Sequence, residues 1–329
     1  MRRREFIAGF GGIAVAWPLA ALAQQTERLR RVSFLYPFPE GARYYAPRVA
    51  ALRKGLAELG WIEGRNLKID LYPGPQEEID DRAAELVRSA PDVIVAGPGL
   101  YATQAVQQLT RTIPIVFVRV GDPVLNLNGF GKSIARPEGN ATGFTNQFGA
   151  SATFGAKWVQ LLKAAAPQMS RIAIVMDISL SGNPPLVIET AAREMGIEPV
   201  RIAVRTPDEV ATAIRVFAAQ PNGGVIVRPP MGPFMYPVVS LAAEYKLPSI
   251  GGSRVEADVG TLLSYGENDF PMFRDAATYV DRILQGAKVG DLPVQFANKL
   301  ELIINLKTAK TIGLEVPRAL LAIADEVIE

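Results

Sequence analysis

The feature that most constrains the fold is a regular alternation of short apolar runs and amphipathic helical segments, which begins near residue 31. Up to residue 118, four predicted strands alternate with three predicted helices. The run at 92–96 is apolar at nearly every position, as expected of a strand buried on both faces. Strands and helices in this order predict an α/β fold with a parallel sheet.

The alternation pauses between residues 121 and 146, where Gly, Pro and Asn accumulate, and then resumes. Such a composition favours loops and crossing segments over packed elements. The second series contains predicted helices at 156–166, 186–195, 208–219 and 237–245, and predicted strands at 172–176, 199–204, 225–227 and 248–250. A last strand–helix–strand block, from 261 to 305, is too short for a third domain.

The chain is therefore predicted to form two α/β lobes with parallel sheets, joined by several chain crossings that act as a hinge. Residues 30–145, together with about 253–290, are assigned to the first lobe. Residues 146–252 are assigned to the second lobe, with 300–329 as a further candidate for it.

The N-terminus has the pattern of an export signal. A basic cluster, Arg2 to Arg4, precedes an apolar run that ends in the small residues around Ala23. Residues 1–23 are predicted to be a signal peptide cleaved after Ala23, which would place the protein in the periplasm; an uncleaved membrane anchor is the alternative. Residues 3–7 are also similar to a twin-arginine signal, while the general secretory route stays open.

Composition removes several classes of function. The chain has no cysteine and no histidine. This excludes disulfides, Cys/His zinc sites and every catalytic triad that needs an imidazole or a thiolate. The three arginines and one glutamate of the signal segment account for the whole formal net charge of +2. The mature chain is therefore neutral, and nucleic acid is not an expected partner.

In open parallel sheets, ligands bind beyond the carboxyl ends of the strands. Arg119 and Arg228 directly follow apolar strands of the two halves, and Arg254 follows another. A guanidinium group offers a rigid fork that matches a carboxylate or a phosphate, so these arginines predict an anion site. The alternative is that each arginine pairs with a local carboxylate, such as Asp122, Asp258 or Glu256, and orders a loop.

Other candidates lie in the same loops. Tyr36 and Tyr101 could supply stacking faces for a flat ligand or belong to the edge of the core. Asp122 precedes a proline and could cap a turn or hold an ammonium group. Asn183 precedes two prolines and could cap a helix whose free N–H groups face an anion. The acidic residues at 77–81 suit a helix N-terminus, and no metal is expected there.

Several short sequence motifs remain, at 61–66, 112–117, 121–124, 136–143, 264–266 and 302–310. Together and in this order they resemble a known family, the ABC-transporter substrate-binding proteins of the tryptophan/tyrosine-binding type. The resemblance implies a type 1 periplasmic binding protein with two Rossmann-like lobes, three crossings and a ligand in the hinge cleft. It further implies delivery to an ABC permease and its ATPase, without catalysis and without a cofactor.

Members of this family that bind amino acids hold the ligand carboxylate with hydroxyl and backbone N–H groups of the loop after the third strand. Here that loop runs from 97 to 103 and contains Gly99, Tyr101 and Thr103. Leu100 stands where the family usually has Ser or Thr, so that hydroxyl contact is missing. Arg254 matches an arginine that is usual in the family, whereas Arg119 and Arg228 replace residues that are mostly small or uncharged.

The sequence thus predicts a monomeric periplasmic receptor that closes around a small organic carboxylate and passes it to an inner-membrane importer. Arg119, Arg228 and Arg254 would hold the anion while Tyr36 and Tyr101 cover its ring. A sensory module that feeds a membrane receptor is the rival interpretation. An enzyme would depend on Asp122 and Glu256 as its acid/base pair.

Overall fold

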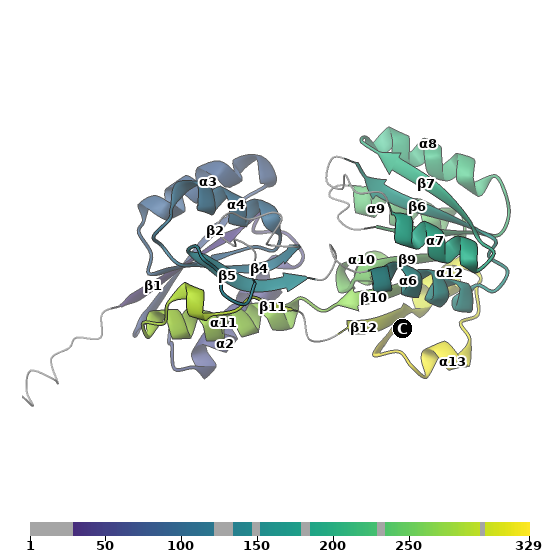
Figure 1. Cartoon of the computed structure of the whole chain (residues 1–329). Coiled ribbons are helices and arrows are strands. Elements are labelled where there is room, and N and C mark those ends of the chain that lie inside the picture. Colours follow the sequence, from purple (N-terminus) through teal and green to yellow (C-terminus); the bar gives the residue numbers. More distant parts are fainter. Residues whose placement is uncertain (1–28, 122–133, 147–151, 179–184, 229–233, 297–299) are drawn as a thin grey trace, which may run out of the picture.

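The computed structural model describes residues 29–121, 134–146, 152–178, 185–228, 234–296 and 300–329. Within these ranges the chain forms two lobes, each built on one twisted sheet (Figure 1). The predicted signal peptide lies outside the described residues. No helix among the described residues is long and apolar enough to cross a membrane.

The sheet of the first lobe has the order β11-β5-β4-β3-β1-β2, and all its pairs are parallel. Its strands are β1 (Arg30–Tyr36), β2 (Leu67–Pro73), β3 (Val93–Ala96), β4 (Ile115–Gly121), β5 (Ala141–Asn146) and β11 (Gln295–Phe296). Its helices are α2 (Tyr45–Glu58), α3 (Ile79–Arg88), α4 (Leu100–Leu109) and α11 (Phe270–Leu284), with the short turns η1 (Gln76–Glu78) and η4 (Val289–Asp291).

Helices cover both faces of this sheet. On β1, Phe34 joins a core with α2 and α11, whereas its neighbour Leu35 joins the opposite core with α3 and α4. This is the alternation that a strand buried on both faces requires. The helices α2 and α11 approach closely at Gly55, where a Cβ atom would lie 2.5 Å from the carbonyl oxygen of Arg274. A larger residue at position 55 would push the two helices apart.

The sheet of the second lobe has the order β13-β12-β10-β9-β8-β6-β7. Its strands are β6 (Arg171–Asp177), β7 (Glu198–Val204), β8 (Gly223–Val227), β9 (Ser249–Ser253), β10 (Leu263–Glu267), β12 (Leu300–Asn305) and β13 (Glu326–Ile328). Its helices are α6 (Ala152–Ala165), α7 (Leu186–Glu194), α8 (Pro207–Ala218), α9 (Met235–Glu244), α10 (Arg254–Val259), α12 (Leu306–Ile312) and α13 (Arg318–Leu321). Only β10 and β12 pair antiparallel among the described strands.

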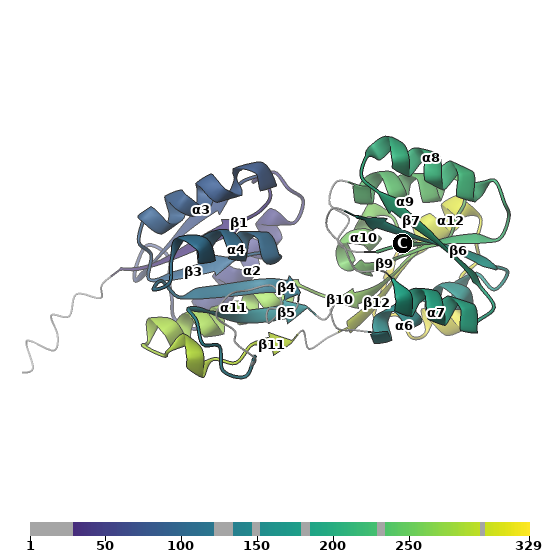
Figure 2. The same ribbon diagram turned by 45° about the horizontal axis from the view of Figure 1, so that its top comes forward.

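The chain passes between the lobes three times: between β5 and α6, between β10 and α11, and between β11 and β12 (Figures 1 and 2). The predicted class of two parallel-sheet α/β lobes is therefore confirmed. One predicted boundary is wrong. The segment from 253 to 267, assigned to the first lobe, belongs to the second sheet, because β10 pairs with β9 on one side and with β12 on the other. The return to the first lobe begins at α11.

Candidate functional site

The carboxyl ends of β4 and β5 point toward the second lobe, and the crossing from β10 to α11 starts beside them (Figure 2). A cluster of charged side chains lies at this crossing. Its centre is Asp269, the residue directly before α11. The Asp269 carboxylate does not cap the helix; it accepts hydrogen bonds from two guanidinium groups of the first lobe.

The first of these guanidinium groups is Arg48, from α2. Its Nη2 lies 2.5 Å from Oδ2 of Asp269, and the two side chains are only 4% and 6% exposed. Its Nη1 donates to the hydroxyl oxygen of Tyr36 at 2.8 Å. Burial opposes the charge of Arg48, but Asp269 and Tyr36 outweigh that cost and raise the pKa of Arg48. A buried ion pair therefore anchors the crossing.

The second guanidinium group is Arg119, at the end of β4. Its φ of 60° lies in the left-handed region, and the register between β4 and β5 shifts at this point. Such a bulge turns a side chain away from its place in the strand alternation. The Nη1 of Arg119 lies 3.5 Å from the Asp269 oxygen that Arg48 already contacts, and the Arg119 side chain is 20% exposed. Two cations thus share one carboxylate, and the more exposed of them is Arg119.

A second acid faces Arg119 from the other lobe. Glu256, on α10, is buried, and its Oε2 accepts a hydrogen bond from the hydroxyl of Ser253. Burial raises the pKa of Glu256 above its ordinary value of 4.5, while Ser253 and the charge of Arg119 act in the opposite direction. The charge of Arg119 therefore acts on an acid of the second lobe as well as on Asp269.

Arg254, the first residue of α10, is engaged by local carboxylates. Its Nε donates to Oδ1 of Asp258 at 3.2 Å, and its Nη1 donates to Oε2 of Glu326 on β13. Burial disfavours the charge of Arg254, but these two acids outweigh it and raise the pKa of the guanidinium. This is the alternative to anion binding that the sequence allowed, in which the arginine pairs with a local carboxylate. Arg254 therefore does not act as a free fork for an anion in this structure.

Arg228 directly follows β8, and its backbone N–H donates to the carbonyl oxygen of Val175 at 3.0 Å. Its side chain is half-buried, and burial lowers the pKa of the guanidinium. Arg228 thus stays a candidate at the carboxyl end of the second sheet.

The two predicted stacking residues differ. Tyr36 is only 1% exposed, and its ring packs between Phe34, Phe38 and Tyr45. Its expected role of covering a ligand ring is therefore corrected: Tyr36 is a core residue whose hydroxyl supports Arg48. Tyr101 is 41% exposed in the first turn of α4, so its ring is available for contact.

The loop after β3 presents backbone more than hydroxyl groups. Gly99 immediately precedes α4 with a φ of 98°, a value that glycine adopts without strain. Thr103 is fully buried, and its hydroxyl donates to the carbonyl oxygen of Gly99 at 3.4 Å. The predicted hydroxyl contact from Thr103 is therefore corrected, since that group is used within the helix. The N–H groups at the start of α4 are what this loop offers to an anion.

Two predicted residues cannot be placed, because Asp122 and Asn183 lie outside the described residues.

Two residues of the cluster were missed by sequence reasoning. Arg48 had a readable signal: it lies on the helical stripe of Tyr45 and Leu52, where a charged residue must find a buried partner. Asp269 had none beyond its place before a helix, because its partners come from residues 150 or more positions away.

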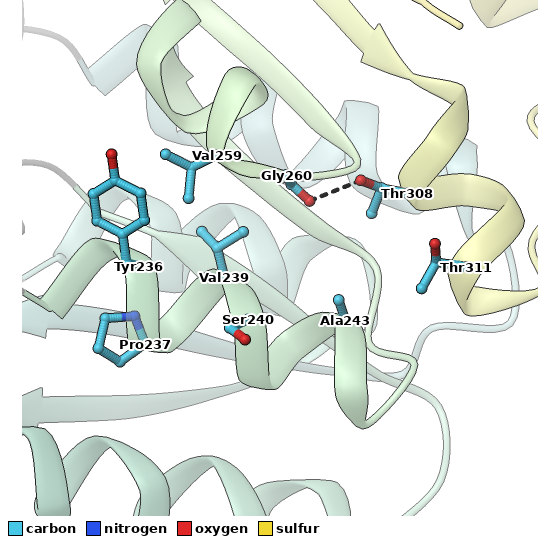
Figure 3. A pocket seen from close by; sticks show the side chains of 9 residues that line it. All are labelled: Tyr236, Pro237, Val239, Ser240, Ala243, Val259, Gly260, Thr308 and Thr311. Carbon is cyan, nitrogen blue, oxygen red and sulfur yellow. Dashed lines mark hydrogen bonds between the residues drawn. The ribbon is translucent and has the colours of Figure 1, made fainter. Parts of the chain in front are cut away.

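A groove of about 610 Å³ lies elsewhere, on the second lobe between α9, α10 and α12 (Figure 3). The groove is lined by residues that include Tyr236, Val239, Thr308 and Thr311. The Thr308 hydroxyl donates a hydrogen bond to the carbonyl oxygen of Gly260 at 2.9 Å. None of the predicted site residues within the described ranges lines this groove. The charges at the crossing, not this groove, therefore define the candidate site.

Two parallel-sheet lobes joined by three crossings define the fold of a type 1 periplasmic binding protein. The sequence pattern of the ABC transporter substrate binding proteins matches residues 43–328, and the chain belongs to this family. The resemblance found in the sequence is thereby confirmed.

Individual relatives support the same assignment. The chain is 27% identical over 275 residues to a protein from Clostridioides difficile (strain R20291) named tyrosine-binding protein, covering 80% of this chain and 75% of that protein. It is 26% identical to a conserved domain protein from Vibrio cholerae, with a TM-score of 0.76 and coverage of 91% and 100%. An ABC domain from Streptococcus pneumonia, solved in complex with L-Trp, has a TM-score of 0.76 at 24% identity, with coverage of 91% and 99%.

Proposed function

We propose that the chain is the extracytoplasmic solute-binding component of an ABC importer, and that it takes a small carboxylate with an aromatic body. Membership in the family supports the transport role. The names of two relatives, one tyrosine-binding and one solved with L-Trp, favour an aromatic amino acid or a close analogue as ligand. The ligand would lie between the carboxyl ends of the two sheets and leave unaltered.

The observation that carries the ligand class is the charge balance at the crossing. The guanidinium groups of Arg48 and Arg119 share the single carboxylate of Asp269. Two cations therefore meet one acid, and Arg119, the more exposed of the two, keeps 20% of its side chain exposed. An anionic group of the ligand would complete this balance, because a guanidinium binds a carboxylate through charge-assisted hydrogen bonds.

The rest of the ligand would meet groups on both lobes. The N–H groups at the start of α4 can add to the recognition of the carboxylate, and the exposed ring of Tyr101 can stack on an aromatic body. Arg228 approaches from the end of β8 in the second lobe. These contacts come from two lobes, so closure of the hinge would enclose the ligand.

Export and assembly complete the proposal. Residues 1–23 act as the signal peptide, and the mature monomer delivers its ligand in the periplasm to a permease driven by an ATPase. No acid/base chemistry is required of the site, since the family binds and releases solutes.

The ligand class is tested by isothermal titration of the mature chain with L-Trp, L-Tyr and L-tryptophanamide, which lacks the carboxylate. We expect binding of at least one of the two acids and loss of binding of the amide. Arg119→Ala should weaken the binding of the acid by about 10- to 100-fold, the range of hydrogen bonds to charged groups. Arg215→Ala, on the exposed face of α8, is the matched control and should retain wild-type affinity.

Two results would contradict this proposal. Equal binding of L-Trp and its amide would remove the carboxylate from the recognition. Unchanged affinity of Arg119→Ala would remove Arg119 from the site, even if the ligand is correct.

A further inference from the structure

Among the described residues, the carboxylate residue Asp258 adds hydrogen bonds between the two lobes to the covalent crossings. The hydroxyl of Tyr44 donates to Oδ2 of Asp258 at 3.1 Å. The Nη1 of Arg43 donates to the backbone oxygen of Asp258, also at 3.1 Å. Arg43 and Tyr44 directly precede α2 of the first lobe, whereas Asp258 lies near the end of α10 of the second lobe. We call Tyr44 and Asp258 the interlobe clasp.

Asp258 is held in place by residues of its own lobe. Its Oδ1 accepts from Nε of Arg254 at 3.2 Å, and Arg254 is in turn tied to Glu326 of β13. The Asp258 side chain is 15% exposed. One oxygen of the carboxylate thus faces each lobe, and the C-terminal strand holds the arrangement. An acceptor oriented in this way loses little freedom when Tyr44 binds it.

Tyr44 is fixed in the same manner on the first lobe. Its ring lies 5.5 Å from the guanidinium carbon of Arg48 and 6.2 Å from the ring of Phe270, which follows the crossing. Burial raises the pKa of the Tyr44 hydroxyl, and the charge of Asp258 raises it further, so the hydroxyl keeps its proton and stays a donor at neutral pH. The clasp therefore contacts the same Arg48 that anchors Asp269.

We infer that the contact between Tyr44 and Asp258 sets the affinity of the protein for its solute by holding the carboxyl ends of the two lobes together, without touching the solute. The effect on affinity rests on the proposed function, whereas the effect on lobe arrangement does not. The two residues are affinity-determining positions outside the ligand-contacting set.

The physical reason is a population effect. The three crossings leave the lobes a hinge, and a hydrogen bond made in one lobe arrangement lowers the free energy of that arrangement alone. In this proposal the solute binds to the arrangement in which Tyr44 meets Asp258, so loss of the contact lowers the fraction of molecules that can bind and raises the apparent dissociation constant by the inverse of that fraction. A charge-assisted bond between two pre-oriented groups is sufficient for about a three- to tenfold change.

The lobe arrangement can be measured without a ligand, because the chain has no native cysteine. Asp81→Cys on α3 and Arg215→Cys on α8 place spin labels at exposed positions of the two lobes. Pulsed electron–electron double resonance then gives the distribution of distances between the two spin labels, one on each lobe. We expect Tyr44→Phe and Asp258→Asn each to add longer distances, and the double variant to resemble either single one. Tyr245→Phe, on the second lobe, is the matched control and should match the wild type.

The affinity is measured on the same variants with L-Trp and L-Tyr as probes. We expect three- to tenfold weaker binding for Tyr44→Phe, while circular dichroism and the melting curve show a folded protein. Unchanged distances in both single variants would overturn the inference. A weaker affinity with unchanged distances would also overturn it, because Tyr44 would then act on the ligand directly. If neither probe binds the wild type, the proposed ligand fails, and the distances alone decide the clasp.

Discussion

Two arginine–carboxylate sites lie at the junction of the lobes, and they differ mainly in their access to water. The side chains of Arg48 and Asp269 are 4% and 6% exposed, whereas those of Arg254 and Asp258 are 30% and 15% exposed. The first pair is covered by the rings of Phe270 and Phe273 on α11 and by that of Tyr44, directly before α2. The second pair shares its arginine with Glu326, which is 40% exposed. An arginine–carboxylate contact thus occurs once away from water, between Arg48 and Asp269, which we call the dry pair. It occurs once in partial contact with water, at Arg254, Asp258 and Glu326, which we call the wet site.

This difference separates two roles. Removal of one partner from a buried pair leaves an uncompensated charge that water cannot reach, so the whole structure is destabilised. Removal of one partner from an exposed pair lets water replace it at little cost. The dry pair therefore acts as a fixed support for the crossing, whereas the wet site contributes less to the stability of the fold.

The largest expected effect is the loss of the dry pair. Arg48→Ala should lower the free energy of unfolding by about 3–5 kcal/mol, because Asp269 is left buried with a single, longer contact to Arg119. Urea denaturation measures this change. Arg82→Ala, which breaks an exposed pair with Glu78 on the first lobe, is the control and should change stability by less than about 1 kcal/mol. A loss as small as that of the control would show that the enclosed pair gives no special support.

An intermediate effect is expected from the buried acid between the two sites. The folded-state pKa of Glu256 lies above its ordinary value of 4.5, so its favourable contribution is complete below pH 4.5 and is lost as the pH rises through the folded pKa. As the pH rises from 4.5 toward the folded pKa, Glu256→Gln should become more stable than the wild type, by a difference that grows by at most about 1.4 kcal/mol per pH unit and is constant above the folded pKa. Urea midpoints between pH 4 and 8 measure the difference. A constant difference across this range would contradict the raised pKa; Glu77→Gln, at an exposed position, is the reference.

The smallest effect is expected for the wet site. Glu326→Gln should lower the free energy of unfolding by about 0–1 kcal/mol, because Arg254 keeps Asp258 and gains water. Added salt should reduce this small difference further. Denaturation at low and high ionic strength is the measurement. A loss near 3 kcal/mol would make the two sites equivalent and would remove the basis of the comparison.

Most of the fold could be predicted from the sequence, because hydrophobic periodicity identifies strands and helices directly. The partners of a strand are not encoded in its own pattern. The segment 261–265 was recognised as a strand, but its place in the second sheet depends on pairing with β9 and with β12. The strand β11 has only two residues and gives no periodic signal at all.

The site could be predicted only as an edge of the sheets. Ligands bind beyond the carboxyl ends of parallel strands, and this principle pointed to Arg119 and Arg228. The structure places both residues near the carboxyl ends of their strands. The partners that decide the charge balance were out of reach, because Asp269 meets Arg48 across 221 positions of sequence. Tyr36 could have been assigned to the core, since it shares the strand face of Phe34.

The packing of α2 on α11 also has a consequence for the order of events during synthesis. Trp61 donates to Asp281, which lies 220 positions later in the chain. The first lobe leaves the ribosome first, but its hydrophobic core is complete only after α11 has been synthesised. A nascent chain in this condition exposes apolar surface until late in translation.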